Sequence, residues 1–166
     1  SSDLPMLAMG NAMSTFTAQN MGAGKIDRVK EGYRMCYVIV LTAGAVLCVM
    51  YQLAGGAFVS LFLDSGSSEA YSVGLSYVKF LSFFYSFIGL KASTDGLLRG
   101  AGDVTAFTVA NLVNLAIRVS VTNLFAPIYG IQVAWMAFPL GWAANYVISF
   151  GWYLTGKWKK VRVIKK

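Results

Sequence analysis

The stretch MCYVIVLTAGAVLCVMYQLAGGAFVSLFL, residues 35–63, contains no charged residue and decides the class of fold. A helix needs about 20 apolar residues to cross the hydrocarbon core of a bilayer, so this run is long enough to span it. A second uncharged run, residues 119–156, contains the turn signal PIYG at residues 127–130 and is expected to form parts of two spans. The composition agrees, with 57% hydrophobic and 13% charged residues and a mean hydropathy of +0.59. We therefore expect a membrane protein.

Charge, glycine and proline divide the whole chain into five predicted spans. Helices are expected, because backbone groups in lipid must be hydrogen-bonded within the segment and no ten-residue alternation typical of a barrel is present. The predicted fold is an all-α transmembrane bundle over residues 1–156, followed by a basic tail at residues 157–166. The five predicted spans are residues 4–19, 35–63, 70–98, 104–126 and 131–155.

The connections between these spans differ in charge. The first carries four basic residues within residues 25–34, Arg99 borders the third, and six more basic residues lie in residues 157–166. The second holds only the acidic Asp64 and Glu69, and the fourth has no charge. Because short cytoplasmic connections carry the excess of Lys and Arg, we expect the first and third connections and the tail in the cytoplasm.

Two Gly-Ala-Gly turns, residues 22–24 and 100–102, lie in these basic connections. Lys25 follows the first, but the upstream Gly and the following Ser or Thr of a phosphate-binding loop are missing. We interpret this turn as a helix end in which Gly takes the left-handed conformation. Attraction of basic segments to an anionic inner leaflet explains the net charge of +7, so no nucleic-acid partner is expected.

An odd number of spans with a cytoplasmic tail places Ser1 outside, although Ser1 is not an initiator and no signal peptide precedes it. We therefore expect the chain to be the C-terminal part of a longer protein.

The sequence contains no His, which excludes the usual general base, the Ser-His-Asp triad and His-rich metal sites. Cys36 and Cys48 are twelve residues apart in one predicted span, so we interpret them as reduced packing residues. No catalytic residue, metal site or cofactor is expected, and the protein is not expected to be an enzyme.

Polar residues recur at helical spacing inside two spans. One face of residues 104–126 is formed by Asn111, Asn114, Arg118 and Thr122. A second face, in residues 70–98, is formed by Lys79, Ser82, Ser86, Gly89 and Ser93. Polar groups are costly in hydrocarbon and tend to face protein or a water-filled cavity. The candidate residues of a substrate or ion pathway are Lys79, Ser82, Tyr85, Ser86, Asp95, Asn111, Asn114 and Arg118.

Alternatives remain open for these candidates. Small and polar faces are also ordinary packing surfaces of membrane helices, and aromatic residues such as Tyr85 can pack or face lipid. Lys79 and Arg118 each need a partner, water or an interface within reach of the side chain. Lys91 and Asp95, four residues apart, are predicted to pair near the cytoplasmic border.

Three segments carry a family resemblance. AMSTFTAQNMGAGKIDR at residues 12–28 resembles a helix and loop of the multidrug and toxic compound extrusion (MATE) family. DGLLRGAGD at residues 95–103 is similar to that family's LRGxGD-like turn, and FPLGW at residues 138–142 resembles its last span. The order and spacing match helices eight to twelve of a twelve-helix transporter with two lobes, both termini of which are cytoplasmic.

The resemblance implies a secondary antiporter in the inner cell membrane that exports drugs or toxic organic compounds, often cationic, in exchange for sodium ions or protons. Alternating access would come from rocking of the two lobes. The implied partners are the lipid bilayer, a small-molecule substrate and the N-terminal lobe of the same protein. Beyond the coupling ion, no cofactor is implied.

Some members bind the coupling ion through acidic residues on helices seven and ten. Residues 70–98 match helix ten, but their only acid is Asp95, near the cytoplasmic turn, and Ile88 lies where such an acid would be expected. The resemblance therefore favours coupling in the N-terminal lobe over a sodium site in these residues.

Two other functions stay open at this point. A flippase for lipid-linked sugars, from the same wider superfamily, would be favoured if Lys79 and Arg118 both pointed into a broad central groove. A membrane subunit without transport of its own, acting as a partner or scaffold, is the third possibility.

Overall fold

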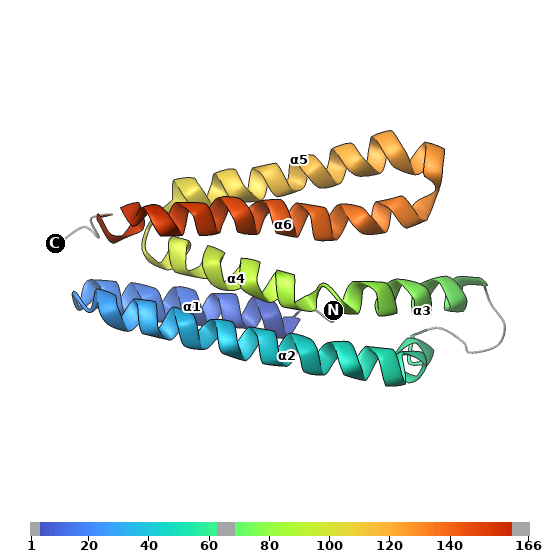
Figure 1. Ribbon diagram of the computed structural model, residues 1–166, viewed down its shortest axis with the longest axis horizontal. Helices are drawn as coiled ribbons and strands as arrows, with labels where there is room; N and C mark the ends of the chain where they lie inside the picture. Colours follow the sequence, from blue (N-terminus) through green and yellow to red (C-terminus); the bar gives the residue numbers. More distant parts are fainter. Residues whose placement is uncertain (1–3, 63–68, 161–166) are drawn as a thin grey trace.

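The computed structural model describes residues 4–62 and 69–160, which form helices and no strand (Figure 1). This confirms the predicted all-α bundle. The elements are α1 (Leu4–Gly22), α2 (Ile26–Ser60), α3 (Glu69–Ser82), α4 (Tyr85–Gly100), α5 (Val104–Tyr129), α6 (Ile131–Thr155) and a 3-10 helix η1 (Lys157–Lys160).

Three of the described helices, α2, α5 and α6, are long and apolar enough to cross a membrane. The α3–α4 pair provides a fourth candidate if it is counted as one bent span. Helix α1 lies outside this set, so the predicted number of five crossings stays a prediction. The split of the uncharged run at residues 127–130 is present: α5 and α6 form a hairpin around Gly130, whose φ is +84°.

The predicted span at residues 70–98 is not one straight helix. It is broken between α3 and α4, whose axes differ by 56°. At the break, Gln52 of α2 donates hydrogen bonds to the carbonyl of Lys79 (2.9 Å) and to the hydroxyl of Ser82 (3.0 Å), and Ser82 itself donates to that carbonyl (2.7 Å). Side chains thus satisfy a carbonyl that a continuous helix would pair with its own backbone, a recognised cause of a kink.

Helices α1 and α4 cross in close contact because both have glycine at the crossing. A Cβ atom on Gly10 would lie 2.6 Å from the carbonyl oxygen of Ala92, and one on Gly96 would overlap the carbonyl oxygen of Gly10. Small residues let two membrane helices approach at backbone distance. Helix α2 packs against α1 and α4 on one side, and the α5–α6 hairpin packs on α4 from the other (Figure 1).

Both Gly-Ala-Gly turns end a helix with a glycine of positive φ, Gly24 (+71°) and Gly102 (+82°). After the second turn, Asp103 caps α5 by accepting a hydrogen bond from the backbone of Ala106, and Trp152 of α6 donates its indole N–H to the same carboxylate at 2.6 Å. These contacts hold the start of α5 against the end of α6.

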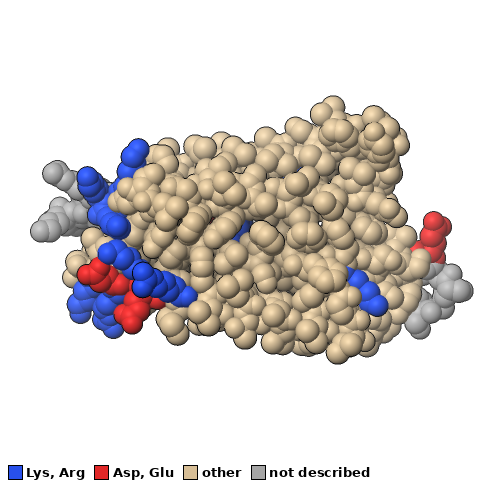
Figure 2. All heavy atoms as spheres, viewed as in Figure 1, with Lys and Arg blue, Asp and Glu red and all other residues tan. Residues whose placement is uncertain are grey.

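Basic side chains gather at the end of the bundle that holds both turns and the end of α6, and a belt with few charges separates them from the opposite end (Figure 2). Part of the predicted tail is ordered, because Trp158 of η1 is buried and donates to the carbonyl of Tyr153 at 3.0 Å. Arg162, Lys165 and Lys166 of the predicted tail, and Asp64 of the second connection, lie outside the described residues.

Candidate functional site

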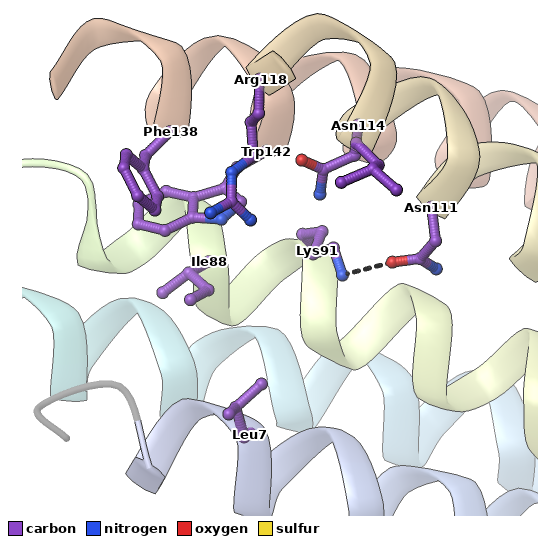
Figure 3. Close-up of a pocket in the computed structure, with 9 residues that line it drawn as sticks. Leu7, Ile88, Lys91, Asn111, Asn114, Arg118, Phe138 and Trp142 are labelled. Carbon is purple, nitrogen blue, oxygen red and sulfur yellow. Dashed lines mark hydrogen bonds between the residues drawn. The ribbon is translucent and has the colours of Figure 1, made fainter. Parts of the chain in front are cut away.

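A pocket of about 340 Å³ opens where α1, α4 and the α5–α6 hairpin meet (Figure 3). Charged, amide and aromatic side chains share its wall. The lining residues are Leu7, Ile88, Lys91, Asn111, Asn114, Leu115, Arg118, Phe138 and Trp142. The predicted polar face of α5 therefore points into a hollow between helices. This agrees with the high free-energy cost of exposing polar groups to hydrocarbon.

Arg118 occupies the pocket wall with its guanidinium over an aromatic ring. The carbon at the centre of the guanidinium lies 4.2 Å from the ring centroid of Phe138, a cation–π contact between α5 and α6. Gly141 makes room for the stem of the side chain, because a Cβ there would lie 2.9 Å from Cγ of Arg118. Within residues 4–62 and 69–160, no carboxylate lies within ion-pair distance of Arg118.

Asn114, one turn before Arg118, is only 7% exposed, and its side-chain oxygen has no hydrogen-bond partner within the described part of the chain. Figure 3 shows its amide directed into the space that Arg118 and Lys91 also enter. A buried acceptor without a partner costs free energy, and the groups of this side chain that an anionic ligand could use are the N–H donors of the amide.

Lys91 and Asp95 form the ion pair that their spacing predicts, with Nζ and Oδ2 2.8 Å apart. Asn111 of α5 accepts from Lys91 at 2.9 Å and donates to Asp95 at 3.2 Å, and Ser149 of α6 donates to the second carboxylate oxygen at 2.8 Å. Asp95 is only 4% exposed. These additional hydrogen bonds are what a buried ion pair needs to offset desolvation.

A smaller hollow of about 160 Å³ continues from the pocket toward the α4–α5 turn. Leu7, Lys91 and Asn111 line both, and Asp95 and Arg99 line only the second. Lys91 thus lies at the junction. The sequence predicts Lys91 only as the ion-pair partner of Asp95; its position in the pocket wall depends on how α4 packs against α5.

Ser82 and Lys79 lie away from this pocket. Ser82 is buried beside α2, within 3.7 Å of the sulfur of Cys48 and hydrogen-bonded to Gln52. Lys79 is half-buried and its methylene groups lie beside Gly55, 3.7 Å from the place where a Cβ would stand. These contacts favour packing; a role of either residue in a transport pathway stays a prediction.

The rest of that predicted face also packs on α2. The hydroxyl of Ser86 lies 2.5 Å from the position of a Cβ on Gly44, and Cys36 donates to Ser93 at 3.1 Å. Tyr85 is buried, with its ring centroid 5.6 Å from that of Tyr51 on α2. The structure therefore brings Asn111, Asn114, Arg118 and Asp95 together and leaves Lys79, Ser82, Tyr85 and Ser86 on the other side of the bent helix pair.

The comparison with known families gives one match over most of the chain: the family model MatE matches residues 3–125. The chain belongs to the MATE family. Its likeness to curated relatives supports the same family. It is 29% identical over 161 residues to the probable multidrug resistance protein YpnP of Bacillus subtilis (strain 168) and 23% identical over 165 residues to the probable multidrug resistance protein YoeA of that strain.

The MATE chain spans little more than a third of these relatives. The match covers 96% of the chain and 36% of YpnP, and 98% of the chain and 35% of YoeA. A solved structure, described as the inward-facing conformation of a multidrug resistance MATE family transporter of the MOP superfamily, shares the fold with a TM-score of 0.79. That match covers 99% of the chain and 36% of the other, at 16% identity.

Membership of the MATE family and the long apolar helices make this chain a multi-pass membrane protein. Ile88 of the MATE chain lines the pocket. It is the residue at which the family resemblance leads one to expect an acid. In the described residues, no group of three or more Cys, Asp or Glu side chains is placed to hold a metal ion.

Proposed function

We propose that the complete protein is a secondary active antiporter that exports drugs or toxic organic compounds by alternating access, in exchange for sodium ions or protons. The observation that carries this proposal is the MatE match over residues 3–125, together with relatives named as probable multidrug resistance proteins. The polar pocket supports it, since a transporter needs a solvated site between helices that can move relative to one another.

The bent α3–α4 pair also supports transport. Transporters often form their sites at broken helices, where irregular backbone is tolerated only if protein or water satisfies it. Here Gln52 and Ser82 satisfy the carbonyl at the break, and α4 continues from it to the pocket. A change of the 56° bend would move Lys91 and Ile88 relative to α5 and α6, and so alter the pocket.

The test is efflux of a cationic dye and of an anionic dye from cells that produce the complete protein, with the sodium and proton gradients collapsed in separate experiments. Loss of efflux with one gradient identifies the coupling ion. Efflux that survives the collapse of both gradients, or no efflux at all, would overturn the antiporter proposal; the latter result would favour a membrane subunit without transport of its own.

A flippase for lipid-linked sugars is the second candidate, and one observation favours it: Arg118 and Lys91 give the pocket a cationic wall. However, Lys79, which this function was expected to place beside Arg118, lies against α2 outside the pocket. Movement of a lipid-linked sugar across proteoliposomes, with no dye efflux, would favour the flippase over the exporter.

We further propose that the protein resides in the inner cell membrane of a bacterium with its C-terminus in the cytoplasm. The basic residues gathered at the end of the molecule that holds the two Gly-Ala-Gly turns support this orientation (Figure 2). The lipid bilayer, a small-molecule substrate and an N-terminal lobe of the same protein are the proposed partners.

A further inference from the structure

We propose that the pocket between α4, α5 and α6 binds an oxyanion, a carboxylate or a phosphate, carried on an apolar or aromatic molecule. The proposal deepens the proposed export function and rests on it only for the claim that the bound molecule is transported. Binding itself follows from the charge, the hydrogen-bonding groups and the shape of the pocket.

The charge balance of the pocket is positive. Its wall contains Lys91 and Arg118 and no carboxylate. Asp95, reached from the adjoining hollow, neutralises Lys91 through the 2.8 Å ion pair, whereas Arg118 has only the face of Phe138 as a partner among the described residues. A half-enclosed guanidinium without a counter-ion is costly at membrane depth, and a bound anion would offset that cost. A cationic ligand would be repelled instead.

The pocket also provides directed donors. A guanidinium presents coplanar N–H groups that match a carboxylate or a phosphate in a bidentate arrangement. The amide of Asn114 is directed into the same space, and its N–H groups are donors that an oxyanion can use (Figure 3). Its oxygen, which would repel an anion, lies against α6, where a Cβ on Gly141 would overlap it. Arg118 and Asn114 lie one turn apart on α5, so both can reach one oxyanion.

The remaining wall is apolar and suits the body of such a molecule. Phe138 and Trp142 of α6 stand edge to face with centroids 6.1 Å apart, and Ile88, Leu7 and Leu115 complete the wall. The volume of about 340 Å³ lies in the range of small-molecule pockets, about 300–1,000 Å³. An aromatic acid of one or two rings would place its ring against α6 and its carboxylate at Arg118.

The test uses three probes that share a ring system and differ in charge: 2-naphthoate, the neutral 2-naphthamide and 2-naphthylmethylammonium. Their binding to the complete purified protein in a non-ionic detergent is measured by equilibrium dialysis. We expect 2-naphthoate to bind about tenfold more tightly than 2-naphthamide, and the ammonium probe to bind most weakly. Equal binding of the three, or preference for the ammonium probe, would overturn the proposal.

Three variants assign the preference to the pocket. Arg118→Gln should abolish the preference for 2-naphthoate and retain binding of 2-naphthamide, and Arg118→Lys, which keeps the charge, should retain part of the preference. Lys79→Gln removes a half-buried cation outside the pocket. It should change neither the preference for 2-naphthoate nor the binding of 2-naphthamide. An unchanged preference in Arg118→Gln, or its loss in Lys79→Gln, contradicts the proposal. If Arg118→Gln fails to fold, as judged by gel filtration, the reduced preference of Arg118→Lys tests the same point.

A lipid headgroup and a soluble solute share this chemistry, and competition separates them. Displacement of 2-naphthoate by short-chain phosphatidylglycerol, but not by phenyl phosphate, identifies a lipid phosphate as the occupant; the reverse identifies a solute.

The proposed export function can fail separately. Selective binding of 2-naphthoate without gradient-driven efflux would contradict export and leave the oxyanion site supported. Conversely, cationic dye efflux by a protein that does not prefer 2-naphthoate overturns this inference alone.

Discussion

Ser149 of α6 donates a hydrogen bond to Asp95 of α4 across 2.8 Å, and the other oxygen of that carboxylate is paired with Lys91 at the same distance. Asn111 of α5 bonds to both members of the pair. One carboxylate therefore connects α4, α5 and α6 in the hollow that adjoins the pocket. Removing it leaves the ammonium group of Lys91, whose side chain is 15% exposed, without its ionic partner.

Asp95→Ala is expected to lower the free energy of unfolding by about 3–5 kcal/mol, because the remaining charge of Lys91 is uncompensated. The double variant Asp95→Leu with Lys91→Leu should recover most of this loss, since both charges are removed together. Unfolding in detergent provides the measurement. Asp27→Ala is the control, because its ion pair with Lys30 is exposed and solvent screens it. Equal losses in the single and double variants would contradict the prediction.

Gly96→Ala is expected to destabilise the protein by about 1–3 kcal/mol, because the new methyl group would overlap the carbonyl oxygen of Gly10 and force α1 and α4 apart. Gly151→Ala is the matched control on α6: nothing lies within 4 Å of a Cβ there, and Ala favours a helix more than Gly. The apparent melting temperature should fall in the first variant and stay or rise slightly in the second. A fall in both would show that the effect does not come from the crossing.

Trp152→Phe is expected to cost about 1–2 kcal/mol, because it removes the indole donor from the carboxylate of Asp103 and keeps an aromatic ring. Trp135→Phe serves for comparison, since the ring of Trp135 contacts Tyr77 and Phe80 at the other end of α6. Hydrogen exchange at the start of α5 should quicken only in Trp152→Phe. Unchanged exchange there would mean that the cap holds without the indole.

The proposed orientation predicts the labelling of single cysteines in a background with Cys36 and Cys48 replaced by Ser. Glu69→Cys, at the start of α3, should react with a membrane-impermeant maleimide in intact cells, and Lys160→Cys should react only after permeabilisation. Both positions are exposed, so neither result depends on burial. The reverse pattern would place the basic end outside.

Much of the architecture follows from the order of residues alone. The uncharged run at residues 35–63 predicts a membrane helix, PIYG predicts the α5–α6 hairpin, and the basic connections share one end of the molecule. The spacing of Lys91 and Asp95 predicts their ion pair correctly. These properties depend on local composition, backbone preference and helical periodicity, all of which a sequence states directly.

The break between α3 and α4 could not be predicted in this way, because the side chain that satisfies the carbonyl of Lys79 comes from Gln52 on another helix. Residues 70–98 contain no proline that would announce a kink. The same limit applies to the polar faces. Periodicity predicts which residues share a helix face, but it does not predict which part of the protein that face contacts.

By periodicity alone, Ser82 and Ser86 are candidates of the same kind as Asn114 and Arg118. In the structure the two serines pack on α2, and Asn114 and Arg118 line the pocket. The sequence by itself determined the membrane class, the all-α fold, the turns and the family resemblance. Only the tertiary structure decided which polar face is a helix contact and which is a site, because that depends on the partner helix, and the partner is chosen by packing between segments distant in the chain.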